Sequence, residues 1–249
     1  MALSFWLSAK GQEPTAKSCF MKWRSLEEST PGADTRPLSE IFAERKSMLT
    51  QYVPQEVQAI HEQVITELRV QGISRRALAV GAKAPSFELA DHHGKAVSSD
   101  ELLKTDRLVI CFFRGRWCPF CVGQLEAMNR ILPQIQKAGA ELVAISPQTV
   151  QQSFFMADQH RLSFSLLSDA GNQIARRFGL VYRVPEYQQA LFRRVMINLP
   201  FTNGDESWEL PVPAVYVVDR DGTILFAAVN PDYKERPEPS EILEHLWRP

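Results

Sequence analysis

The residues with the clearest chemistry are two cysteines, Cys118 and Cys121, in the run RGRWCPFC at 114–121. This run follows an apolar stretch at 108–113 that is typical of a buried strand, and a helical pattern comes after it. Pro119 suits the first position of that helix, so Cys118 falls at the N-cap and Cys121 in the first turn. Both sulfurs then lie at the positive end of the helix dipole, where free amides lower a thiol pKa. The spacing favours a thiolate at neutral pH and disulfide exchange between two close sulfurs.

Charged and aromatic residues flank the two cysteines. Arg114 and Arg116 are expected to lower the thiol pKa further, because a neighbouring cation favours the thiolate. Trp117 and Phe120 bracket the thiols. They are expected either to form an apolar lip for a substrate or to pack against neighbouring loops.

A zinc site and an inert pair of cysteines are the alternatives. Structural zinc takes four ligands, usually from a second paired motif, and Cys19, Cys111 and five scattered histidines provide none. Cys111 lies inside the apolar stretch and is expected to be a small core residue, and Cys19 a free thiol. The order of strand, aromatic residue, Cys-x-x-Cys and helix is typical of a redox site. We therefore expect neither a metal nor a cofactor.

The pattern around the motif predicts alternating strands and helices. Strands are expected at 87–90, 108–113, 141–146, 164–168, 214–219 and 223–229, and helices at 121–137, 150–161, 173–178 and 241–247. Pro133 predicts a kink in the first of these helices. Residues 180–210 carry Pro, Asn, Gly and a helical piece at 186–196, which indicates an insertion. The order describes an α/β fold with a mixed central sheet flanked by helices.

The chain before residue 80 has a different texture. Apolar residues recur at spacings of three and four over 53–68, which predicts one apolar helix face, with Pro54 in the first turn and Gly72 at the stop. We therefore divide the chain into a loosely ordered extension (1–37), a helical extension (38–79) and the α/β domain (80–249).

Composition excludes several classes of protein. The 249 residues include 28 Lys and Arg against 29 Asp and Glu, and a net charge of −1 gives no general attraction to nucleic acid or anionic membranes. Apolar stretches such as 108–113 fall far short of the roughly 20 residues that span a bilayer. The start lacks the basic residue of a secretory signal. Four cysteines in so long a chain do not form a small secreted disulfide framework, so we expect a reducing compartment, the cytoplasm.

Arginines gather in or near the predicted insertion. A solvated helical face is the expectation for them, and a docking surface for an acidic partner is the alternative. They are Arg176, Arg177, Arg183, Arg193 and Arg194.

The region from about residue 80 to the end resembles the peroxiredoxin family, also called alkyl hydroperoxide reductase and thiol-specific antioxidant. The matching stretches are VGAKAPSF at 80–87, FFRGRWCPFC at 112–121, PAVYVVDRDG at 213–222 and NPDY at 230–233. The chain is similar in particular to a divergent subgroup that keeps a Cys-x-x-Cys pair. This resemblance implies a thioredoxin-like fold and an antioxidant activity carried by thiols.

The sequence departs from the family pattern at the site itself. Peroxiredoxins carry Pro-x-x-x-Thr/Ser-x-x-Cys, and aligning their peroxide-attacking cysteine with Cys121 puts Cys118 at the Thr/Ser position and Arg114 at the Pro position. Their later active-site arginine falls on Pro213, where thioredoxins place a cis-proline beside the cysteine pair. A cis bond before Pro213 is therefore expected, with a trans edge proline as the alternative. Thioredoxins also bury an Asp before the first cysteine, and Phe112 stands there instead.

The leading hypothesis is a thiol–disulfide oxidoreductase in which Cys118 attacks and Cys121 resolves. In a thiol peroxidase the roles reverse, and Cys118 condenses with the sulfenic acid formed on Cys121. A third hypothesis is a redox sensor or binding module whose disulfide switches partner affinity without turnover. The expected partners are a dithiol donor, such as a thioredoxin or glutaredoxin system, and a peroxide or protein disulfide substrate. A homodimer is left open.

Overall fold

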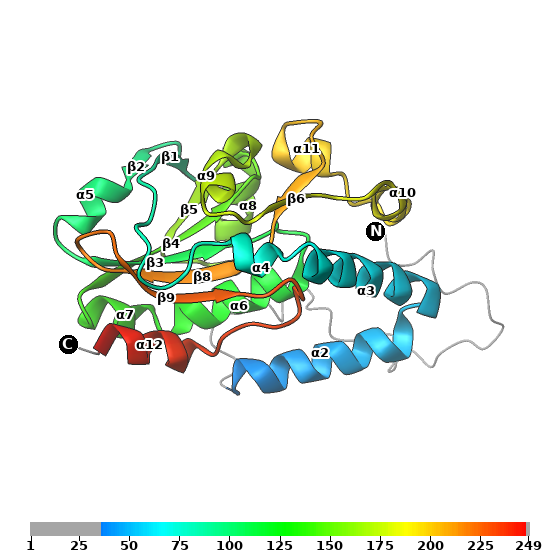
Figure 1. Ribbon diagram of the computed structural model, residues 1–249, viewed down its shortest axis with the longest axis horizontal. Helices are drawn as coiled ribbons and strands as arrows, with labels where there is room; N and C mark the ends of the chain where they lie inside the picture. The colour runs from blue at the N-terminus through cyan, green and yellow to red at the C-terminus, as the bar shows by residue number, and fades with distance from the viewer. Residues whose placement is uncertain (1–35, 248–249) are drawn as a thin grey trace.

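A seven-stranded mixed sheet forms the centre of the computed structural model, which describes residues 36–247 (Figure 1). Its strands are β1 (Glu88–Asp91), β2 (Ala96–Ser98), β3 (Arg107–Phe112), β4 (Ala140–Ser146), β5 (Ser165–Ser168), β8 (Ala214–Val218) and β9 (Ile224–Val229). Their order is β2-β1-β5-β4-β3-β8-β9. The three middle strands β5, β4 and β3 run parallel to one another. Strands β1 and β8 pair antiparallel with β5 and β3, and the edge strands β2 and β9 pair antiparallel with β1 and β8. The predicted mixed sheet and its six predicted strands are confirmed, and β2 is an additional one.

Helices cover both faces of the sheet (Figure 1). They are α2 (Leu38–Tyr52), α3 (Gln55–Val70), α4 (Ile73–Arg76), α5 (Ser99–Leu103), α6 (Pro119–Arg130), α7 (Leu132–Lys137), α8 (Val150–His160), a short 3-10 helix (Ala170–Asn172), α9 (Gln173–Arg177), α10 (Glu186–Arg194), α11 (Leu199–Asn203) and α12 (Pro239–Trp247). The predicted kink near Pro133 is confirmed, because the chain bends at Ile131 between α6 and α7.

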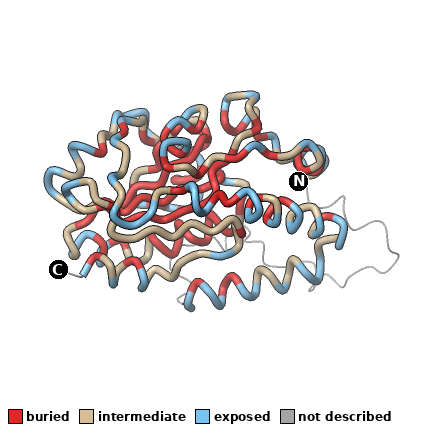
Figure 2. The backbone as a smooth tube through the Cα atoms, in the orientation of Figure 1, coloured by how far each residue is buried: buried red, intermediate tan, exposed pale blue. Residues whose placement is uncertain are grey.

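The core has two layers, one on each face of the sheet. Successive side chains of a strand point to opposite faces. In β3, Val109 and Cys111 pack toward α6, α7 and α12, whereas Leu108 and Ile110 pack toward the segment before β1 and α9. Cys111 is fully buried, as predicted for a small core residue. Figure 2 shows this continuous buried interior along the central strands.

The predicted insertion forms a second, smaller sheet. Strands β6 (Val181–Arg183) and β7 (Glu209–Pro211) pair antiparallel, and α10 and α11 lie between them in the chain. Neither strand was predicted. Each has only three residues, too few for the alternation of apolar and polar side chains to be recognised.

Helices α2 and α3 form a hairpin, and α2 contacts α6 (Figure 1). Helix α3 starts after Pro54, buries Val57, Val64 and Leu68 on one face, and is followed by Gly72 with a φ of 67°, as predicted. The residues of α2 that are buried belong to the same core as Cys121. The division at residues 37 and 79 stays a prediction, and nearly all of 1–37, including Cys19, lies outside the described residues.

None of the helices between residues 36 and 247 is both long and apolar enough to cross a membrane.

Candidate active site

The cysteine pair lies between the end of a buried strand and the start of a helix. Strand β3 ends at Phe112, a short loop follows, and α6 starts with Pro119 in its first turn. Cys118 is the N-cap, and its sulfur accepts a hydrogen bond from the backbone N–H of Cys121 at 3.4 Å. The predicted placement of both cysteines at the helix N-terminus is therefore confirmed.

Both cysteines are fully enclosed, with 0% of either residue exposed. The ring of Phe120 lies 5.0 Å from that of Phe42 in α2, and the ring of Trp117 lies 5.3 Å from that of Phe192 in α10. The two aromatic residues that bracket the thiols therefore pack under neighbouring helices. The packing alternative holds, and the open apolar lip does not.

Arg114 is a buried cation directly beside the first sulfur. Its Nη2 donates to Cys118 Sγ at 3.2 Å, and only 4% of the residue is exposed. Its guanidinium lies 3.8 Å from the centre of the Tyr233 ring and 5.0 Å from that of Trp117. No carboxylate among residues 36–247 pairs with it. A buried cation without a counter-charge is strongly unfavourable, so the charge balance of the site calls for an anion at Cys118.

The two sulfurs have opposite acidities. Burial would raise the pKa of the Cys118 thiol, but the hydrogen bond from the Cys121 thiol, the charges of Arg114 and Arg236, and the hydrogen bond from Arg114 outweigh it and hold this pKa well below its usual value. Burial raises the pKa of Cys121 well above its usual value, and the hydrogen bond to Cys118 and the thiolate charge there raise it further. The pair is therefore a thiolate at Cys118 hydrogen-bonded by a thiol at Cys121.

Arg116 does not take part in this electrostatic arrangement, which corrects the prediction for it. Its side chain is exposed and donates to Gln152 in α8 at 3.2 Å, and its backbone N–H donates to Gln148 at 3.0 Å. Successive residues of the loop point in different directions, so only Arg114 faces the sulfurs.

The second cation at the site is Arg236, which sequence reasoning missed. Its Nη2 donates to Cys121 Sγ at 3.6 Å, and its Nε donates to Gln124 Oε1 at 2.8 Å. It comes from the segment between β9 and α12. The stretch NPDY at 230–233 marked this segment in the sequence, but nothing there indicated that it folds back over α6.

Pro213 lies at the site, but with a trans peptide bond. No peptide bond among residues 36–247 is cis, so the expected cis bond before Pro213 is wrong and the trans alternative holds. The backbone N–H of Val212 donates to Leu180 at 2.8 Å, and Ala214 already pairs with Phe112, so the chain enters β8 extended. A trans X–Pro bond is the favoured form where the backbone is extended.

A small cavity of about 10 Å³ adjoins the site. Arg114 and Pro213 line it from the sheet side, and His61 and Ile65 from α3. Burial, together with the charges of Arg114 and Lys234, lowers the pKa of His61 to about 4, so this imidazole is neutral at physiological pH. Phe112, at the position of the thioredoxin Asp, is fully buried against Phe178 and Tyr216, and no carboxylate enters from there.

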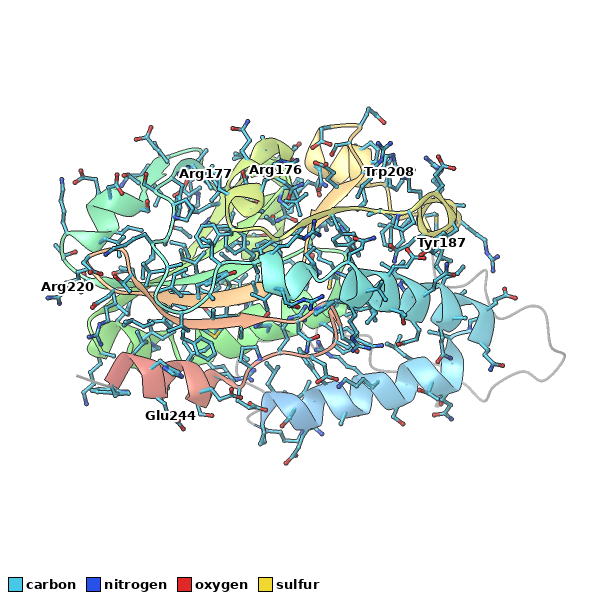
Figure 3. All side chains as sticks on the ribbon, in the orientation of Figure 1. Arg176, Arg177, Tyr187, Trp208, Arg220 and Glu244 are labelled. Carbon is cyan, nitrogen blue, oxygen red and sulfur yellow. The ribbon has the colours of Figure 1, made fainter. Side chains whose placement is uncertain are left out.

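Other predicted features lie apart from the cysteines. Within residues 36–247, no group of three or more His, Cys, Asp or Glu side chains could hold a metal ion. The arginines near the insertion are spread over different partners: Arg176 pairs with Glu209, Arg194 with Glu56, and Arg177 donates to the carbonyl of Ser86. Figure 3 labels Arg176 and Arg177, which lie next to each other. They form no single basic patch, which agrees with solvated helix faces.

Comparisons with known proteins agree with this fold and identify the family. A family model described as AhpC/TSA family matches residues 80–227. A chloroplastic peroxiredoxin Q of Triticum aestivum is 33% identical over 177 residues, which cover 70% of this chain and 71% of that protein. The chloroplastic peroxiredoxin Q of Gentiana triflora is 32% identical over 144 residues, 58% of this chain and 56% of that one. The chain thus spans little more than half the length of this second relative.

Solved structures show the same fold. Peroxidoxin BcpB from Mycobacterium tuberculosis superposes with a TM-score of 0.54 at 20% identity, over 68% of this chain and 96% of that structure. The expected thioredoxin-like arrangement of a mixed sheet flanked by helices is therefore confirmed. Since the family model covers more than half of the residues, the chain belongs to the AhpC/TSA family, the family of the peroxiredoxins.

Proposed function

We propose that the chain is a thiol-dependent oxidoreductase with an antioxidant role, which cycles Cys118 and Cys121 between dithiol and disulfide. Cys118 is the attacking thiolate and Cys121 the resolving thiol. The observation that carries this assignment is the 3.2 Å contact between Arg114 and Cys118 in a buried site without a carboxylate partner for that arginine among residues 36–247. Family membership supports thiol chemistry in general.

The cycle has two oxidative steps when the oxidant is a hydroperoxide. The Cys118 thiolate attacks one peroxide oxygen, the O–O bond breaks, and the alkoxide or hydroxide leaves and takes a proton from water. Cys118 is then a sulfenic acid. The Cys121 sulfur attacks the sulfenic sulfur, the S–O bond breaks, and the hydroxyl leaves with the Cys121 proton as water. An external dithiol reduces the resulting disulfide by exchange.

The same pair can act on a disulfide substrate. The Cys118 thiolate attacks one substrate sulfur and forms a mixed disulfide, and the other substrate sulfur leaves as a thiolate. Cys121 then displaces the first sulfur, which closes the intramolecular disulfide. Both variants of the cycle begin at the same thiolate, so the assignment of Cys118 holds for either oxidant.

The second candidate is a thiol peroxidase in which Cys121 attacks the hydroperoxide and Cys118 resolves. The peroxide-attacking cysteine of the family aligns with Cys121 in the sequence, and Arg236 contacts Cys121 Sγ at 3.6 Å. Against it stands the raised pKa of Cys121, which keeps that sulfur protonated while Cys118 is the anion.

The proposal includes the partners that this chemistry needs. We propose a dithiol donor of the thioredoxin or glutaredoxin kind and work in a reducing compartment, the cytoplasm. Four cysteines in a chain of 249 residues do not form a small secreted disulfide framework, which supports this proposal. The relatives named above are chloroplastic proteins, so targeting of this chain is measured best by locating the tagged full-length protein in cells.

Single cysteine variants test the assignment. With hydrogen peroxide, Cys121→Ser is expected to accumulate a sulfenic acid at Cys118, detected by dimedone labelling and mass spectrometry, whereas Cys118→Ser is expected to react little. Sulfenic acid at Cys121 in Cys118→Ser would instead establish the second candidate. Wild-type chain that is oxidised once and shows no turnover with thioredoxin or dithiothreitol would indicate a redox sensor.

A further inference from the structure

Part of the cover over the cysteine pair lies outside the stretch that the family model matches. Cys118 and Cys121 are fully buried in a family stretch that spans residues 80–227. Two segments outside this stretch pack over the site: the α2–α3 hairpin and the segment 230–238. The effect of these segments on the site can be tested separately from the thiol chemistry.

Helix α2 docks directly on the first turn of α6. The ring of Phe42 lies 5.0 Å from that of Phe120, and Arg45 Nη1 donates to the Pro119 carbonyl at 2.5 Å. Gly123 leaves the space for this contact, because a Cβ there would lie 2.2 Å from Arg45 Nη1. Two side chains of α2 thus cover the turn that carries both sulfurs.

Helix α3 and Tyr233 close the other side. The ring of Tyr233 contacts both α6 and α3, with ring-centre distances of 5.8 Å to Phe120 and 5.9 Å to His61. The cavity left beside Arg114 has about 10 Å³, room for one water molecule. Arg114 lines this cavity, and neither cysteine does. Hydrogen peroxide is only slightly larger than water, so it needs a smaller movement of the cover than a protein does to reach the sulfurs. A protein loop that carries a disulfide needs the cover to move away.

The cover is held by contacts that can open without unfolding the sheet. Lys46 pairs with Glu235 at 2.5 Å, Glu62 pairs with Lys234, and the carboxylate of Glu238 accepts from the first backbone N–H groups of α2. Lys46 and Glu235 are both exposed, and such exposed ion pairs contribute little stability each. Of the 15 residues in α2, only Leu38, Ile41 and Phe42 are buried.

The segment that holds the hairpin also touches the sulfurs. Arg236 donates to Cys121 Sγ, and Tyr233 stacks on Arg114, which donates to Cys118 Sγ. Disulfide formation removes the thiolate charge that attracts both arginines. The contacts of the segment 230–238 with the site are then weaker, and so is its hold on the hairpin.

We propose that the α2–α3 hairpin is the size-selective specificity determinant of this site. Docked through Phe42 and Arg45 over the reduced pair, it admits a small oxidant and excludes a protein disulfide. It loosens when the disulfide has formed, so that a protein-sized dithiol donor reaches the pair. The inference rests on the proposed function, because it assumes that the Cys118–Cys121 disulfide forms.

The test compares a small and a large oxidant on the reduced full-length chain. Rates of Cys118–Cys121 disulfide formation are measured with hydrogen peroxide and with insulin as the protein disulfide. In Phe42→Ala, the insulin rate relative to the peroxide rate is expected to rise about tenfold or more, because loss of the buried ring weakens docking. Lys46→Ala, which leaves the core intact, is expected to raise the ratio less. Lys83→Ala is the matched control. Lys83 forms a comparable exposed ion pair with Asp221, with 2.9 Å between Nζ and Oδ2, in a part of the molecule away from this site.

The outcomes separate the inference from the proposed function. If the ratio of insulin rate to peroxide rate is unchanged in both hairpin variants and oxidation by peroxide is normal, the hairpin is not the size-selective determinant. The proposed function is then unaffected. If neither hydrogen peroxide nor insulin produces the Cys118–Cys121 disulfide, the proposed function itself is contradicted. Hydrogen exchange of the α2 amides, measured on reduced and oxidised wild type, tests the release step without any substitution. Faster exchange in the oxidised chain is expected, and equal exchange contradicts it.

Discussion

Arg114 and Cys118 form a buried charge pair four residues apart in the chain, with Nη2 3.2 Å from Sγ. Burial opposes the charge of the guanidinium, yet the Cys118 thiolate outweighs it and keeps the pKa of Arg114 above its usual value. Each group thus stabilises the ionised form of the other. In this pair the cysteine takes the place that a carboxylate has in most buried ion pairs. The thiolate that balances the charge of Arg114 is also the nucleophile.

Removal of this cation is expected to raise the pKa of Cys118. In Arg114→Met the thiolate loses the hydrogen bond from the guanidinium and its positive charge. The rate of alkylation by iodoacetamide at pH 7 should therefore fall about tenfold, the change in thiolate population for one pKa unit. The measurement is the pH profile of alkylation, read by mass spectrometry at Cys118. Arg116→Met is the matched control, because its side chain turns to Gln152. Equal profiles for Arg114→Met and wild type would show that the arginine is not the cause.

Stability of the reduced chain should depend on pH through the same thiol. The pKa of Cys118 is lower in the folded than in the unfolded chain, so its contribution is complete above the unfolded value of about 8.5 and is lost as pH falls through the folded value. The free energy of unfolding of wild type minus that of Cys118→Ser should rise by up to about 1.4 kcal/mol for each pH unit between these two pKa values. Urea unfolding with reductant present, from pH 5 to 9, measures this difference. A flat difference would mean that Cys118 is not ionised in the folded chain.

Arg236 is expected to act mainly on the resolving step. It contacts Cys121 Sγ and lowers the pKa of that thiol against burial, so Arg236→Gln should make Cys121 a poorer nucleophile. The sulfenic acid at Cys118 should then live a few times longer before the disulfide closes, as one cation contributes part of the shift. Dimedone trapping at timed intervals after peroxide addition measures this lifetime. Arg220→Gln is the control and should leave the lifetime of the sulfenic acid unchanged. Arg220 is exposed and lies at the opposite end of the molecule from the α2–α3 hairpin (Figure 3).

Gly179 is expected to be irreplaceable in the fold. It has a φ of 75°, and a Cβ there would lie 2.3 Å from the backbone oxygen of Arg76. Gly179→Ala should therefore lower the free energy of unfolding by about 3 kcal/mol or more, the sum of left-handed strain and a backbone clash. Gly171→Ala separates the two causes, because Gly171 has a φ of 70° with nothing within 4 Å of its Cβ position. If urea unfolding shows the same loss of unfolding free energy in both variants, the clash with Arg76 does not contribute to it.

The local structure of the motif was predictable because its causes are local. Pro119 can start a helix and cannot continue one, so the N-cap position of Cys118 follows from residues next to it in the chain. The six predicted strands were found because apolar runs bounded by turn residues identify them. The three-residue strands β2, β6 and β7 were missed, since their pairing comes from distant segments and not from their own pattern.

The departures at the site arise from contacts between distant parts of the chain. Neighbouring arginines 114 and 116 look equivalent in the sequence, but the loop turns one toward the sulfurs and the other toward α8. The second cation comes from position 236, 115 residues after Cys121. The backbone of Pro213 follows the pairing of β8 with β3, and its trans bond was not readable from the local Val-Pro-Ala sequence.

By itself the sequence determined a thiol pair at the start of a helix, within a mixed α/β fold, because helix capping and hydrophobic periodicity depend on residues close together in the chain. Only the tertiary structure decided which sulfur is the anion and whether the pair is open. Acidity depends on burial and on the charges within a few ångströms, and accessibility depends on what packs above. Here those neighbours come from α2, α3 and the segment 230–238, which meet at the cysteines only after the chain has folded.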